Sequence, residues 1–121
     1  MIKTYGARKL GVLPAHRKMM LRQLATSLVH FERITTTQAR AKELRIYFER
    51  TLSKLKKVES TVNRARLADQ LLAPNGYHAV KKLLETLLPR YQSKRGGFVR
   101  VIGMNPRRSD SAQIARVELL S

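Results

Sequence analysis

Two stretches of this sequence carry lysine and arginine without a single acidic residue, and such stretches favour the binding of phosphate groups. Residues 1–31 contain six lysines and arginines, and residues 86–109 contain another six. Arginine binds phosphate oxygens in pairs or stacks on unpaired bases, whereas lysine acts as a point charge. Together with a histidine inside the first stretch, these cations are the predicted nucleic-acid contacts: Lys3, Arg8, Lys9, His16, Arg17, Lys18, Arg22, Arg90, Lys94, Arg95, Arg100, Arg107 and Arg108.

Between the two stretches the charges are mixed. Glu43, Glu49 and Glu59 are interleaved with the cations Arg40, Lys42, Arg45, Arg50, Lys54 and Lys56. Acids and bases interleaved along a helix are typical of a solvated helix face. We therefore place the predicted contacts in the two acid-free stretches.

The three histidines raise an enzymatic alternative, because a ribonuclease can use paired imidazoles as general acid and base. His16, His30 and His78 lack catalytic or metal-ligand spacing. No phosphate-cradling glycine motif precedes a Lys-Ser/Thr pair, cysteine is absent, and the eight carboxylates are scattered. We therefore expect a binding protein that is not an enzyme and has no metal or cofactor. A small basic ribonuclease and a free nucleic-acid-compacting protein are the alternatives.

The composition indicates one folded domain with a polyanionic partner. The 121 residues carry a net charge of +17, and 43% of them are hydrophobic, which is enough for a core. Self-repulsion of this size opposes compaction unless a polyanion neutralises it and releases counterions. No apolar run approaches the roughly 18 residues of a membrane helix. The basic beginning would also suit a mitochondrial transit segment, but we interpret it as an RNA-binding arm.

Apolar spacings of three and four predict four helices. The first begins at Pro14, which suits a first helical turn, and ends near Phe31. The others cover residues 37–58, 62–72 and 77–88, and Pro89 is predicted to stop the last. β-branched residues predict strands at 32–37, 98–104 and 114–120, the last two forming a hairpin around a polar loop.

This order predicts an α+β fold in two layers, α-β-α-α-α-β-β, with helices on one face of a small three-stranded sheet. Residues 1–13 form a basic arm and residues 14–121 a single globular domain. Arg100 and Arg116 alternate with apolar neighbours, so both are expected on one side of the sheet. Tyr91 is equally suited to core packing and to stacking on RNA.

Four ordered blocks of the sequence also resemble a known family. They are Arg8–Gly11 with His16–Lys18 and Leu24–Val29, Glu32–Thr37 with Ala41–Arg45, Leu88–Tyr91 with Gly96–Phe98, and Asp110 with Val117–Leu119. In these blocks, over nearly its whole length, the chain resembles the seventeenth large-subunit ribosomal protein of the bacterial type, the L17 family.

The resemblance implies a two-layer α/β fold and a structural role in the large ribosomal subunit, in support of translation. It implies binding to large-subunit rRNA near the exit of the nascent-chain tunnel, beside ribosomal proteins such as the L32 type. The family's rRNA contacts correspond to Arg8, Lys9, His16, Arg17, Arg22, Arg90, Arg95 and Arg100. The loop at residues 106–112 is more similar to mitochondrial members. We therefore expect a mitochondrial ribosome, with the bacterial cytoplasm as the alternative.

Overall fold

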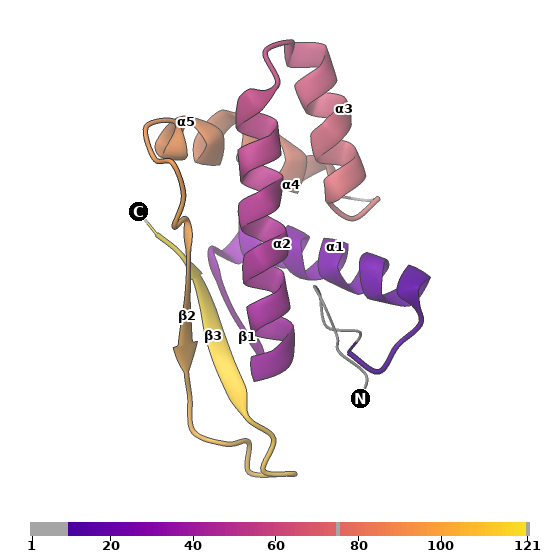
Figure 1. Ribbon diagram of the computed structural model, residues 1–121, viewed down its shortest axis with the longest axis vertical. Coiled ribbons are helices and arrows are strands. Elements are labelled where there is room, and N and C mark those ends of the chain that lie inside the picture. The colour runs from indigo at the N-terminus through magenta and orange to yellow at the C-terminus, as the bar shows by residue number, and fades with distance from the viewer. Residues whose placement is uncertain (1–9, 75, 121) are drawn as a thin grey trace, which may run out of the picture.

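The computed structural model describes residues 10–74 and 76–120 and confirms the predicted α+β fold (Figure 1). Its elements follow the predicted order, with the fourth helix divided by a π-helical turn, η1. The bounds are α1 Pro14–Phe31, β1 Arg33–Thr37, α2 Gln38–Lys57, α3 Thr61–Leu71, α4 Tyr77–Lys82, η1 Leu83–Leu87, α5 Leu88–Tyr91, β2 Val99–Gly103 and β3 Ile114–Leu119. The predicted arm and domain boundary remain predictions, because residues 1–9 lie outside the described part.

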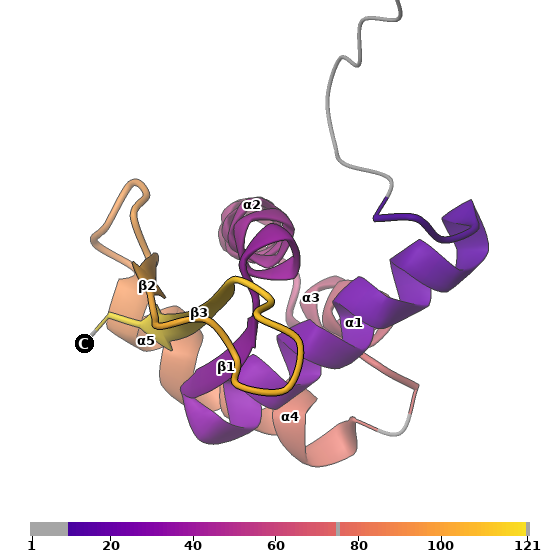
Figure 2. The same ribbon diagram turned by 90° about the horizontal axis from the view of Figure 1, so that it is seen from below.

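The sheet is antiparallel and has the strand order β1-β3-β2. In the central strand Ala115 and Val117 are fully buried, and Val117 pairs with Ile34 on one side and Val101 on the other. Because side chains alternate along a strand, this row faces the helical layer and the intervening residues face outward. Seen from below, β2 and β3 lie on one side of α2, with α1 and α3 on its other side (Figure 2).

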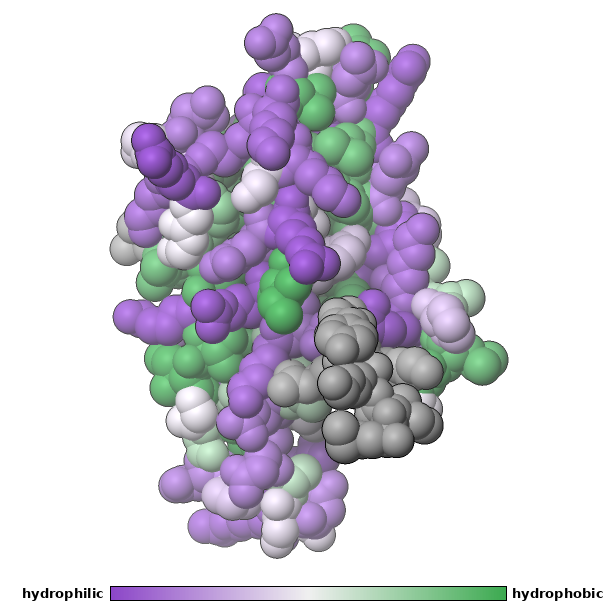
Figure 3. Space-filling model, in the orientation of Figure 1, coloured by the Kyte–Doolittle hydropathy of each residue, from purple (hydrophilic) through white to green (hydrophobic). Residues whose placement is uncertain are grey.

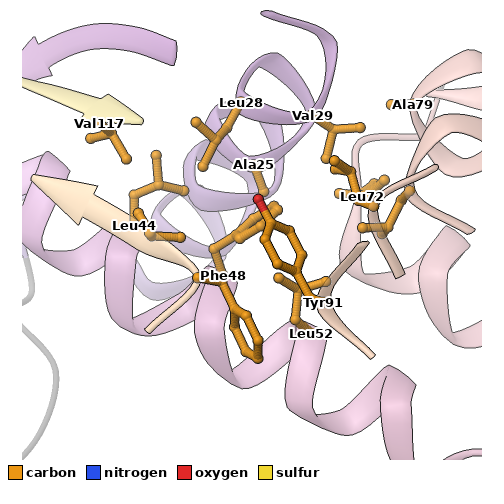
Figure 4. Packing of buried hydrophobic residues seen from close by; sticks show 14 of the residues in the cluster. Ala25, Leu28, Val29, Leu44, Phe48, Leu52, Leu72, Ala79, Tyr91 and Val117 are labelled. Atoms are coloured by element: carbon orange, nitrogen blue, oxygen red, sulfur yellow. The ribbon is translucent and has the colours of Figure 1, made fainter. Parts of the chain in front are cut away.

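The core lies where α1 and α2 cross. Leu28 of α1 and Leu44 and Phe48 of α2 have no exposed surface, and Tyr91 of α5 enters the same cluster (Figure 4). Burial of each large apolar side chain contributes about 1.5–3 kcal/mol, so this cluster provides the main stabilisation of the fold. Leu28, Leu44 and Phe48 lie at the apolar spacings of three and four that predicted α1 and α2, whereas the role of Tyr91 was left open by the sequence.

Phe31 departs from the predicted apolar face of α1. Its side chain is 72% exposed, although its spacing matches the buried positions before it. The helix ends at this residue because Glu32 adopts a left-handed conformation (φ +60°), and its N–H donates to the Leu28 carbonyl oxygen over 2.8 Å. The chain then turns into β1 and leaves the Phe31 ring at the surface.

Pro89 does not stop the helix where the sequence predicted. Helical backbone continues to Tyr91, because the N–H of Leu88 donates to the carbonyl oxygen of Leu83, five residues earlier, in a π-helical turn. Pro89 then falls in the first turn of α5, where its missing N–H needs no acceptor. The extra turn carries Tyr91 into the core.

Within the described residues, none of the helices has the length and apolar character needed to cross a bilayer.

Candidate nucleic-acid interface

At the start of α1 the predicted contacts separate into exposed and engaged side chains. His16 and Lys18 are exposed. Arg17 lies against α2, with its Nη2 atom 3.0 Å from Oε2 of Glu43, a carboxylate that is only 5% exposed. A buried carboxylate requires a cation or donors nearby. Arg17 therefore joins α1 to α2, and any contact it makes with RNA must use its outer surface.

Arg22 joins α1 to the end of α3. Its Nε atom donates to the carbonyl oxygen of Leu72 over 2.8 Å, and Nη2 donates to that of Asp69 over 3.2 Å. Beside it, the Thr26 hydroxyl accepts from the N–H of Ala73 over 2.8 Å. The last carbonyl groups of a helix lack N–H donors within the helix, and the guanidinium group of Arg22 donates to two carbonyl oxygens at this end of α3. Arg22 thus has a structural role that its sequence context did not indicate.

Arg90 forms a charged cluster with the end of α1. Its Nη1 atom lies 2.5 Å from Oε1 of Glu32, and Nζ of Lys82 lies 3.6 Å from Oε2 of the same carboxylate. The hydrogen bond from Arg90 is the main reason that the pKa of Glu32 falls below its ordinary value of 4.5. The Glu32 carboxylate therefore forms ion pairs with two cations, and the cluster has a net positive charge.

Tyr91 packs in the core. Its side chain has no exposed surface, its hydroxyl donates to the Leu120 carbonyl oxygen, and its ring centre lies 5.2 Å from that of Phe98. Burial raises the pKa of the Tyr91 hydroxyl above its ordinary value of 10.0. Of the two roles that the sequence left open, the structure supports packing.

The outer face of the sheet gathers three arginines around one carboxylate. Oε2 of Glu118 in β3 lies 2.8 Å from Nη2 of Arg100 in β2, and its Oε1 lies 3.7 Å from Nη1 of Arg116. Arg33 of β1 pairs in register with Glu118 from the other side and is exposed. The expectation that Arg100 and Arg116 share one side of the sheet is confirmed, and the face has a net positive charge.

Arg33 was missed at the sequence level because it follows directly after Glu32, outside both acid-free stretches. Arg33 precedes Ile34 on the predicted strand, and an apolar residue facing the core implies that its neighbour faces outward. This alternation was the signal that could have identified Arg33.

The hairpin loop presents the remaining predicted cations. Arg107 binds Asp110 through two hydrogen bonds, of 3.0 Å from Nε and 2.9 Å from Nη2, and Asp110 also accepts from the N–H of Ala112. The Arg107 hydrogen bonds lower the pKa of Asp110. This bidentate pair fixes the loop, and the neighbouring Arg108 is exposed.

Five further predicted contacts lie in the other loop and in the arm. Lys94 is partly buried and its carbonyl oxygen accepts from Lys56, whereas Arg95 is exposed. Lys3, Arg8 and Lys9 lie outside the described residues.

The structure does not gather the histidines into a site. His30 lies beside Phe31, with ring centres 6.2 Å apart, and His78 lies beside Tyr77 at 5.5 Å. In the ranges 10–74 and 76–120, no three His, Cys, Asp or Glu side chains lie close enough together to hold a metal ion.

Comparisons with known proteins confirm the resemblance to the L17 family. Residues 20–120 match the family model described as "Ribosomal protein L17". A protein of Endomicrobium trichonymphae, named "Large ribosomal subunit protein bL17", is 42% identical over 121 residues and covers all of both chains. A protein of the same name from Caldanaerobacter subterraneus subsp. tengcongensis is 41% identical over 113 residues, 93% of this chain and 97% of its own. At this identity over nearly the full length, the chain belongs to the ribosomal protein L17 family.

Proposed function

We propose that this chain is a structural constituent of the large ribosomal subunit that binds and stabilises large-subunit rRNA and so supports translation. The observation that carries the proposal is the outer face of the sheet, where Arg33, Arg100 and Arg116 surround only one carboxylate, Glu118. The uncompensated positive charge of this face can bind phosphates, and counterion release makes that binding strong at low salt.

The exposed cations at two other places extend the same interface. His16 and Lys18 stand at the beginning of α1, next to the basic arm that we propose for residues 1–13. Arg108 stands at the tip of the hairpin, in a loop held by the Arg107–Asp110 pair. We propose that the globular part, residues 14–121, fixes rRNA helices while the arm runs between them. Arg17, Arg22 and Arg90 contribute to this interface chiefly by holding its elements in place.

Large exposed apolar side chains favour neighbours among the large-subunit proteins. Phe31 and Tyr77 are each 72% exposed, and aromatic side chains are enriched where protein surfaces meet. We propose a ribosomal-protein neighbour of the L32 type, in keeping with the family resemblance.

The two relatives are bacterial proteins, and they support a bacterial ribosome rather than the mitochondrial one expected from the loop at residues 106–112. We therefore propose the bacterial cytoplasm as the compartment. Mass spectrometry of purified large subunits from the source cells, with mitochondrial subunits as a second sample where they exist, tests both membership and compartment.

Binding to deproteinised large-subunit rRNA, measured at several salt concentrations, tests the proposal directly. We expect log K to fall linearly with log salt, and the double variant Arg100→Gln/Arg108→Gln to reduce that slope by about 1.4–1.8. Arg66→Gln/Lys81→Gln is the control, because it also removes two charges, from exposed positions on α3 and α4. A variant slope equal to that of the wild type would remove the sheet and hairpin from the interface.

Two further measurements separate the alternatives. Competition with duplex DNA distinguishes an rRNA ligand from general compaction of nucleic acid. Incubation with labelled RNA distinguishes binding from cleavage, and cleavage that disappears in His16→Ala or His30→Ala would establish a ribonuclease instead.

A further inference from the structure

We propose that a groove between α2 and the loop at residues 92–98 binds the sugar–phosphate backbone of RNA. This inference rests on the proposed function and adds a second contact surface to it. The groove, here called the α2 groove, is open and has a volume of about 520 Å³. The lining residues that bear on binding are Arg50, Ser53, Lys54, Lys57, Arg95 and Gly96.

The cations of the α2 groove come from two distant parts of the sequence. Arg50, Lys54 and Lys57 follow one another at spacings of four and three along α2, so they share one face of the helix. Arg95 meets them from the loop after α5. Glu49 is the single acid in the lining, so four cations face one carboxylate. Arg50, Lys54 and Lys57 are exposed, as expected of a solvated helix face, and the fold places Arg95 beside them.

The spacing of these cations suits a phosphate chain. Residues four apart on a helix have Cβ atoms about 5–6 Å apart, which is comparable to the separation of successive phosphates along an RNA strand. A concave surface lined by one sign of charge also concentrates the field that attracts a polyanion. The surface over α2 is dominated by hydrophilic side chains (Figure 3).

The loop that forms the other wall is held in place. Nζ of Lys56 donates to the carbonyl oxygen of Lys94 and lies 5.2 Å from the ring centre of Phe98. Phe98 is fully buried, and its carbonyl oxygen accepts from the N–H of Leu120 over 2.9 Å. Gly97 takes a φ of +71°, which turns the chain between the exposed loop and the buried ring. The groove therefore exists before any ligand binds.

Gly96 leaves the middle of this wall open. A Cβ atom at this position would meet no atom within 4 Å, and the backbone of Gly96 lies outside the left-handed region. A side chain is thus sterically acceptable in the free protein. Its absence allows the closest approach of the chain to a bound strand, which is a recurrent use of glycine beside phosphates.

The test measures the salt dependence of binding to deproteinised large-subunit rRNA for four proteins. We expect Lys54→Gln/Lys57→Gln to lower the slope of log K against log salt by about 1.4–1.8. We expect Gly96→Val to lower both the affinity and the slope, although it leaves the net charge at +17, because its side chain keeps the strand away from the cations. Arg66→Gln/Lys81→Gln is the control, because it removes two charges from exposed positions on α3 and α4, and it should have a smaller effect than the groove variants.

The outcomes separate this inference from the proposed function. A wild-type chain that fails to bind rRNA would overturn both. Steep wild-type binding that is retained in the groove double variant and in Gly96→Val would overturn the groove alone. Unchanged rRNA binding combined with lost binding of polyglutamate, an acidic probe, would assign the groove to a protein segment and overturn the RNA assignment. Thermal melting of each variant verifies that it is folded.

Discussion

Arg22 and Leu72 are joined by a hydrogen bond of 2.8 Å from the guanidinium Nε atom to the backbone carbonyl oxygen, fifty residues apart in sequence. With its second bond, to the carbonyl oxygen of Asp69, the side chain closes the last turn of α3 against α1. A cation that sequence context assigns to RNA thus holds two helices together. Substitution of Arg22 should therefore change the stability of the fold and leave the salt dependence of rRNA binding unchanged.

We expect Arg22→Ala to lower the free energy of unfolding by about 1.5–3 kcal/mol, the usual value of a hydrogen bond to a charged group. The free energy of unfolding of Arg22→Lys should lie between those of the wild type and Arg22→Ala, because a lysine cannot donate to both carbonyl groups with the planar geometry of arginine. Urea denaturation measures both. We also expect the slope of log K against log salt for rRNA to stay at the wild-type value. A slope reduced by about one unit in a variant of unchanged stability would instead make Arg22 a phosphate contact.

Tyr91→Phe should destabilise the fold by about 1–2 kcal/mol, because it leaves the partly buried carbonyl oxygen of Leu120 without its donor. Binding to rRNA should be unchanged, since the ring has no exposed surface. Urea denaturation and a filter-binding assay measure the two quantities. Weakened rRNA binding at unchanged stability would contradict the packing role.

The pH dependence of Tyr91 has a definite sign. Burial raises the pKa of its hydroxyl above 10.0 in the folded protein, so the unfolded chain loses this proton first as the pH rises. The stability is therefore complete below pH 10 and decreases above it. Tyr91→Phe should remove part of this decrease, and the pKa of Tyr47, which burial also raises, should account for a further part.

The fold was largely predictable because local patterns specify it. The buried Leu28, Leu44 and Phe48 lie at the apolar spacings that predicted α1 and α2, and the alternation on β2 and β3 placed Arg100 and Arg116 on one face. These features depend on neighbouring residues in the chain and on the periods of helix and strand.

The partners that individual cations bind within the protein were not predictable, because they are set by tertiary contacts. Arg17 meets Glu43 across 26 residues, and no local pattern identifies that partner. The α2 groove likewise arises only when the fold brings Arg95 beside Lys54. The π-helical turn before Pro89 was missed because a proline at that place usually ends a helix.

Glu32→Gln should reduce stability on the neutral side and flatten its acid dependence. The hydrogen bond from Arg90 lowers the pKa of Glu32 below 4.5, so the folded protein binds this proton less readily than the unfolded chain. The contribution is thus present above about pH 4.5 and is lost as the pH falls through the lowered pKa. Both partners are about a third exposed, so we expect only about 0.2–1 kcal/mol.

Thermal melting between pH 3 and pH 7 measures this effect, with Glu85→Gln as the control, since Glu85 is an exposed acid on η1. If the two variants lose the same stability at neutral pH, the cluster of Glu32, Arg90 and Lys82 contributes nothing specific.

Glu118→Gln should tighten rRNA binding at low salt. A glutamate is charged at neutral pH, and the hydrogen bond from Arg100 lowers the pKa of Glu118 further below its ordinary value of 4.5. The carboxylate therefore cancels one of the three arginine charges on the outer face of the sheet. Its removal frees that charge for a phosphate, and the slope of log K against log salt should steepen by about 0.7–0.9. Glu85→Gln changes the net charge equally but lies in the helical layer, so it should leave the slope unchanged. Equal steepening in both variants would show that the total charge governs binding, and that the arginines around Glu118 have no special place in it.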